Sequence, residues 1–215
     1  MDEELEVGQV EERLAVLGAE FGLTPEQSAG FRSKAAAWRG LIAALEAKGY
    51  FDEVVREVPA PVRVLMKNPP LGAVWMPAIA FQYVFRALSI RLDDNGMRQL
   101  ARHSLIRGPM KTMKPVIEGM LRLFGAKPIN FLRRTPGVME RQLEGVKFEF
   151  FESQSENEAS MHIDYYLLRD LPRECFTYWE GVFTTVFDIC GIDDFSTEVE
   201  IEPGRHAATI RFRWA

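Results

Sequence analysis

The chain has 215 residues, of which 47% are hydrophobic, and this is enough for one sizeable core. No charged-then-apolar leader and no apolar run of membrane-spanning length is present, so we expect a cytoplasmic protein without a membrane span. Two cysteines are typical of a reducing compartment, and a net charge of -5 argues against nucleic acid as a partner.

Charge is distributed unevenly along the chain. Residues 98–147 carry a net charge of +8, whereas residues 148–204 carry -12. The two stretches could bind each other, pair between subunits or simply be solvated. If the basic stretch instead contacts an anionic partner, the expected partner-binding residues are Lys127, Arg133 and Arg134.

The pattern predicts an acidic N-terminal extension over residues 1–23 and a single α+β domain over residues 24–215. Its helical part, residues 24–144, is divided by glycines and prolines. Periodicity and capping residues predict helices over 25–48 (with a break near Gly30), 52–58, 77–92, 97–106, 110–124, 128–134 and 136–143.

In the sheet part, residues 145–215, apolar residues alternate over 146–150 and again over 161–168, which predicts a first β-hairpin. Pro172 then opens a long amphipathic helix that ends before Gly191. Its apolar stripe consists of Phe176, Trp179, Phe183, Val186, Phe187 and Cys190.

A second hairpin is predicted over residues 198–202 and 208–214, with the glutamates of one strand opposite the arginines of the other. The expected fold class is therefore α+β. A helical half precedes an antiparallel sheet of order strand-strand-helix-strand-strand, which packs on the long amphipathic helix.

Motifs for common catalytic and metal sites are missing. The sequence has no phosphate loop, no dinucleotide fingerprint and no zinc-ligand spacing. His162 and Asp164 could exchange a proton or form a plain surface pair. Cys175 could be a reactive thiol at a helix start or a small buried residue. We therefore expect a protein that is not an enzyme, with no catalytic and no metal-binding residues.

Three segments carry a family resemblance: WRGLIAALEAKGYFDEVVREV (38–58), LRLFGAKPINFLRRT (121–135) and FTYWEGVFTTVFDICG (176–191). They resemble a myxobacterial paralogous family of uncharacterised proteins. More distantly, helices followed by two hairpins around one helix are similar to the ligand-binding fold of heme-NO-binding domains, 4-vinyl-reductase-type domains and small TRAPP subunits.

The heme-binding members of that fold hold heme propionates with a Tyr-x-Ser-x-Arg motif. The matching positions here are Tyr165, Leu167 and Arg169, so the serine is replaced. The proximal histidine of those members aligns near Met139, and no histidine occurs between His103 and His162. On this basis we expect no cofactor, heme included.

The resulting hypothesis is a bacterial, non-catalytic sensory or adaptor module for signal transduction, expected as a homodimer. It would bind a small apolar ligand or a protein partner. The pocket candidates are Tyr165, Arg169, Trp179 and Phe183, and for Tyr165, Trp179 and Phe183 simple core packing is the more common role. The alternatives are a structural interaction protein that uses its basic helices and, less favoured, a heme sensor or an enzyme.

Overall fold

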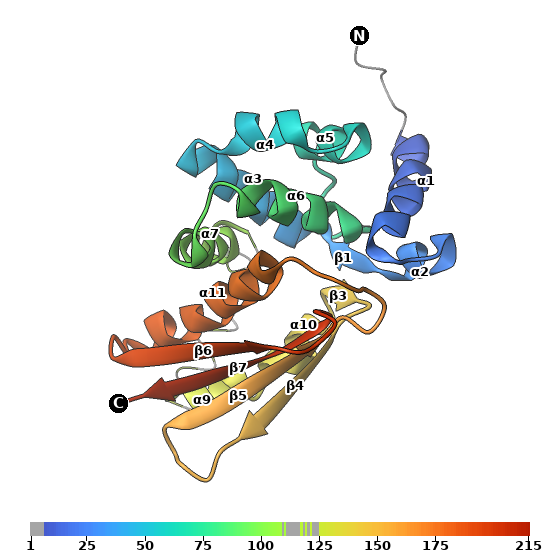
Figure 1. The fold of residues 1–215 in the computed structure, drawn as a ribbon. Coiled ribbons are helices and arrows are strands. Elements are labelled where there is room, and N and C mark those ends of the chain that lie inside the picture. Colours follow the sequence, from blue (N-terminus) through green and yellow to red (C-terminus); the bar gives the residue numbers. More distant parts are fainter. Residues whose placement is uncertain (1–6, 109, 111–116, 118, 120, 122–124) are drawn as a thin grey trace.

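A four-stranded antiparallel sheet, one long helix and a group of shorter helices form three successive levels in Figure 1. The computed structural model describes residues 7–108, 110, 117, 119, 121 and 125–215. The helix predicted over 110–124 therefore lies largely outside the described residues. The described helices before the sheet are α1 (Val7–Leu17), η1 (Gly18–Phe21), α2 (Pro25–Gly30), α3 (Ala35–Lys48), α4 (Phe51–Glu57), α5 (Ala60–Lys67), α6 (Ile79–Ser89), α7 (Asp94–Arg107), α9 (Pro128–Leu132) and α10 (Thr135–Met139).

The sheet has the order β4-β5-β7-β6, and every neighbouring pair is antiparallel. Its strands are β4 (Lys147–Glu152), β5 (Glu158–Asp164), β6 (Phe195–Ile201) and β7 (Ala207–Trp214). Glu198 lies opposite Arg211, and Val199 lies opposite Ile210. The predicted α+β class is confirmed. In the second hairpin Glu198 faces an arginine as predicted, whereas Glu200 faces Thr209.

The long helix α11 (Arg173–Cys190) lies between the sheet and the helices α3, α6 and α7 (Figure 1). The sequence predicted one apolar stripe, but the opposite side of α11 is buried as well, because α7 packs against it. Gly181 makes this close contact possible: a Cβ atom there would lie 2.5 Å from the carbonyl oxygen of Arg98.

Buried threonines occupy the side of α11 that lies outside the predicted apolar stripe. The hydroxyl of Thr177 donates to the carbonyl of Arg173, and those of Thr184 and Thr185 both donate to the carbonyl of Gly181. These hydroxyls are thus satisfied by the backbone of their own helix, which permits their burial.

A second, small sheet was not predicted. It has the order β2-β1-β3, from β1 (Arg32–Lys34), β2 (Trp75–Pro77) and β3 (Leu143–Glu144). Strands of two or three residues are too short for an alternating pattern to appear in the sequence. This small sheet joins three segments that are distant in the sequence. It also positions Phe31 and Ser33, which line the cavity described below.

The described part of the expected N-terminal extension packs on the helical part. Val10, Leu14 and Phe21 are all buried. The ring of Phe21 contacts the edge of Tyr83, with 5.2 Å between the ring centroids, and the Tyr83 hydroxyl donates to the carbonyl of Leu17. Over the described part of the chain, no helix combines the length and the hydropathy needed to cross a bilayer.

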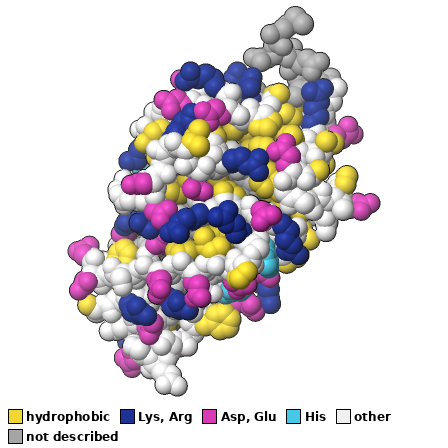
Figure 2. All heavy atoms as spheres, in the orientation of Figure 1, with side chains coloured by type: hydrophobic (Ala, Val, Ile, Leu, Met, Phe, Trp, Pro, Cys, Tyr) yellow, Lys and Arg dark blue, Asp and Glu magenta, His cyan; other side chains and the backbone are white. Residues whose placement is uncertain are grey.

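Ion pairs connect the basic stretch of the chain to the acidic stretch. Arg98 pairs with Glu180, Arg102 with Asp188, and Arg133 with Glu152. Figure 2 shows acidic and basic side chains interspersed over the face it displays. Part of the charge asymmetry in the sequence is therefore neutralised within the folded chain.

Candidate functional site: an apolar cavity between the helices and the sheet

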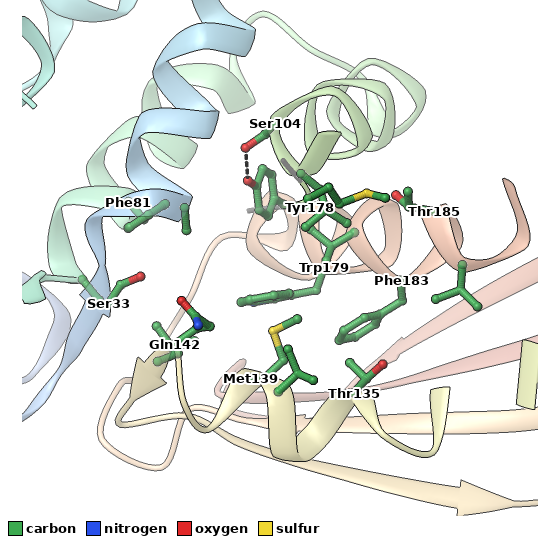
Figure 3. Close-up of a pocket in the computed structure, with 18 of the residues that line it drawn as sticks. Ser33, Phe81, Ser104, Thr135, Met139, Gln142, Tyr178, Trp179, Phe183 and Thr185 are labelled. Carbon is green, nitrogen blue, oxygen red and sulfur yellow. Dashed lines mark hydrogen bonds between the residues drawn. The ribbon is translucent and has the colours of Figure 1, made fainter. Parts of the chain in front are cut away.

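A cavity of about 190 Å³ lies where α6, α7, α10 and α11 meet (Figure 3). Most of the described residues that line it are apolar, and many are aromatic. Trp179 and Phe183 point into it from α11, and Met139 and Thr135 point into it from α10. The walls therefore come from both the helical part and the sheet part of the fold.

Two predicted pocket residues, Trp179 and Phe183, form an aromatic wall of the cavity. Their rings stack with 5.8 Å between centroids, and Trp179 also meets the edge of Phe148 at 5.0 Å. Phe183 is buried, whereas Trp179 is only partly buried. Flat faces of this kind favour contact with another ring.

A third predicted residue, Tyr165, lies at the end of β5 and is 2% exposed. Its hydroxyl oxygen accepts a hydrogen bond from Nε1 of Trp179 at 2.5 Å and one from Sγ of Cys175 at 3.1 Å. Burial raises the pKa of Tyr165 well above its usual value and raises the pKa of Cys175 to about 12. Both groups are therefore neutral near pH 7, and neither is poised as a base or a nucleophile.

Gln82 is a lining residue that the sequence analysis did not identify. It lies in α6, is 1% exposed, and its Oε1 atom has no hydrogen-bond partner. Its amide lies near the Tyr165 hydroxyl and the Cys175 thiol, where it partly offsets the larger effect of burial, which raises the pKa of both groups. A single amide within the otherwise apolar run Ile79–Val84 was the available signal.

Several hydroxyl groups of the lining already have partners in the protein. The hydroxyls of Ser104 and Tyr178 are hydrogen-bonded to each other at 2.8 Å (Figure 3). Thr135 donates to the carbonyl of Phe131, and Thr185 donates to that of Gly181. The orphan oxygen of Gln82 differs from these groups.

The remaining predicted site residues lie elsewhere. Arg169 is exposed, donates to the carbonyl of Leu168, and is not among the lining residues. Lys127 is exposed before α9, and Arg133 is engaged by Glu152. Arg134 is exposed, donates to the carbonyl of Asn130, and also contributes to the lining. The proposed binding roles of all these residues remain predictions.

The three histidines of the chain, all within its described part, do not line the cavity. His162 lies on β5, where its Nδ1 is 3.2 Å from the hydroxyl of Thr209 and 3.8 Å from a carboxylate oxygen of Glu202. Burial lowers the pKa of His103, whose Nε2 is buried without a partner. The described residues contain no cluster of metal-ligating side chains.

Comparison with solved structures shows that the fold is that of H-NOX domains. An Fe(II) unliganded H-NOX protein from K. algicida matches with a TM-score of 0.60 and 12% identity, over 85% of this chain and 96% of that chain. An oxygen-binding H-NOX domain related to soluble guanylate cyclases, in its oxygen complex, matches with a TM-score of 0.57 and 12% identity, over 84% and 94%. A Cs H-NOX mutant also matches with a TM-score of 0.57 and 12% identity, over 84% and 96%.

Neither a protein-family model nor a curated relative matches the chain. The structural matches support the resemblance to heme-NO-binding domains at the level of the fold. Membership of the myxobacterial family stays a prediction.

The expectation of no cofactor needs correction. The structural neighbours include H-NOX proteins studied for heme redox potential and heme distortion, so heme is a candidate cofactor for this fold. The replaced serine at Leu167 and the missing proximal histidine near Met139 do not exclude a heme held by other residues.

The residues present in the cavity do not fit a histidine-bound heme. The described lining offers the thioether of Met139 and the phenols of Tyr165 and Tyr178, but no imidazole. Thioethers and phenols do serve as heme ligands in other proteins. A cavity of about 190 Å³ is also close to the volume of roughly 150 Å³ that holds benzene, so a four-ring porphyrin requires lining side chains to move.

Proposed function

We propose that this domain binds a compact apolar molecule in the cavity and acts as a sensory ligand-binding module. The observation that carries the proposal is the cavity itself, whose aromatic walls come from both parts of the fold. Its volume of about 190 Å³ is below the range of roughly 300–1,000 Å³ typical of sites for drug-sized ligands. A molecule of one or two rings is the matching size.

A sensory role is supported by the fact that the cavity walls come from several different helices. An occupant would contact Phe81 and Gln82 of α6, Trp179 and Phe183 of α11, and Met139 of α10 at the same time. If it binds one arrangement of these helices more tightly than another, it shifts the population toward that arrangement. The neutral state of Tyr165 and Cys175 supports binding rather than catalysis.

The test uses p-xylene as the probe and compares the wild type with Phe183→Trp. The larger ring should occupy the cavity and weaken p-xylene binding by at least about tenfold, as measured by calorimetry or ligand-detected NMR. Phe187→Trp is the matched control, because Phe187 is equally buried on α11 but is not among the lining residues. Both variants overpack the core, with an expected loss of about 1–3 kcal/mol in stability.

Equal binding of p-xylene by Phe183→Trp and Phe187→Trp would contradict the proposal.

Heme is the second candidate occupant, favoured by the fold and by the position of Met139 in the lining. Titration with hemin tests it separately. A sharpened, shifted visible absorption band that is lost in Met139→Leu would identify a heme held through the thioether.

A further inference from the structure

We propose that the molecule bound in the cavity is neutral and carries one hydroxyl group, which pairs with the side-chain amide of Gln82. This inference rests on the proposed function and gives the chemical class of the ligand. Compounds with a single ring and one hydroxyl, such as simple phenols, belong to this class.

The side-chain amide of Gln82 lies buried in the wall of the cavity. Gln82 is 1% exposed and lines the cavity, and its Oε1 has no hydrogen-bond partner. A buried amide oxygen without a partner is unfavourable, and such groups are rare in folded proteins. An occupant with a donor group would satisfy this oxygen.

The hydroxyl groups of the lining differ from Gln82 because they already have hydrogen-bond partners. The hydroxyls of Ser104 and Tyr178 satisfy each other, and Thr135 and Thr185 donate to backbone carbonyls. A ligand gains little from groups that already have partners. The amide of Gln142 also lines the cavity, but that residue is only partly buried. Gln82 is therefore the fully buried amide that sets the orientation of an otherwise apolar ligand.

A hydroxyl group on the ligand suits the side-chain amide of Gln82 better than a charged group does. A hydroxyl both donates and accepts, so it complements the amide whichever way its oxygen and nitrogen are turned. Charge is disfavoured, because Arg134 is the one charged side chain among the described lining residues and it is exposed. A carboxylate or ammonium group in the apolar part of the cavity would lack a buried counter-charge.

The experiment measures the affinities of p-cresol and p-xylene, two probes of nearly the same shape that differ by a hydroxyl in place of a methyl group. In Gln82→Met, which keeps the length of the side chain but removes the amide, p-cresol should bind about tenfold more weakly. The affinity for p-xylene should change by no more than about twofold. Thr135→Val, a lining variant of nearly constant volume, should leave both affinities within about twofold.

A measurement on the wild type covers the case in which Gln82→Met does not fold. The side-chain amide signals of Gln82 in a ¹⁵N-correlated NMR spectrum should shift with p-cresol and much less with p-xylene. Suppose that p-xylene binds, but Gln82→Met changes the affinities of both probes equally, or both probes shift the amide signals equally. The assignment to Gln82 is then overturned and the proposed function stands. If neither probe binds the wild type, the proposed function itself fails.

Discussion

Replacing Tyr165 by phenylalanine tests whether the hydroxyl of Tyr165 holds the wall of the cavity together. The change removes the oxygen that accepts hydrogen bonds from Nε1 of Trp179 and Sγ of Cys175. An indole N–H can only donate, so that of Trp179 would be left without its acceptor in apolar surroundings. The thiol is a weak donor, so most of the loss comes from the indole N–H and its unpaired state, about 2 kcal/mol of unfolding free energy in all. For a chain of 215 residues this lowers Tm by roughly 4–8 °C.

Urea denaturation of the variant, followed by far-UV circular dichroism, gives the loss directly. Tyr166→Phe is the matched control, because Tyr166 is 51% exposed and should tolerate the change within about 0.5 kcal/mol. A double-mutant cycle with Trp179→Phe isolates the bond, with an expected coupling of about 1 kcal/mol. If Tyr165→Phe is as neutral as Tyr166→Phe, the hydrogen-bonding role assigned to this hydroxyl is wrong.

Three further predictions concern packing, pH and thiol chemistry. Gly181→Ala should destabilise the fold by about 2 kcal/mol in urea denaturation, because its Cβ would lie 2.5 Å from a backbone oxygen of α7. Gly137→Ala, with nothing within 4 Å, should be neutral or slightly stabilising; equal effects would refute the close-contact argument. Burial lowers the pKa of folded His103 below 6.5, so the unfolded chain binds this proton more readily and stability should fall as pH drops through and below 6.5. His103→Gln should reduce that loss between pH 7.5 and 5.5, and an unchanged profile would contradict it. Burial raises the pKa of Cys175 to about 12 and that of Cys190 to about 11. Because Cys190 is only partly buried, a thiol-specific reagent at pH 8 should label it first, whereas rapid labelling of Cys175 would show that Cys175 is accessible.

The parts of the fold that could be predicted are those in which one sequence pattern determines the structure. The second hairpin is the best example, because the alternation of Val199 and Ile201 with glutamates fixes both the buried face and the pairing with β7. The end of α11 at Gly191 follows from the left-handed conformation of that glycine, which has a φ of 69°.

The features that were missed depend on contacts between distant parts of the chain. Glu180 and Thr184 lie outside the predicted apolar stripe, yet they are buried, since α7 supplies Arg98 and a closely packed backbone. The pocket prediction identified Trp179 from the aromatic stripe, but it overlooked Gln82, whose only signal was a single amide within an apolar run. Cavities arise from how elements are placed together, and periodicity within one element does not describe that placement.

The threonines of α11 have a mechanical consequence. Because Thr177, Thr184 and Thr185 are satisfied by carbonyls of their own helix, these hydrogen bonds travel with α11 when it moves. A sliding or rotating displacement of α11 along α7 breaks none of them. Resistance comes instead from cross-links such as the Arg98–Glu180 ion pair and the bond between Ser104 and Tyr178. The bond between Ser104 and Tyr178 lies in the cavity wall, so a molecule bound there would contact one of the links between α7 and α11.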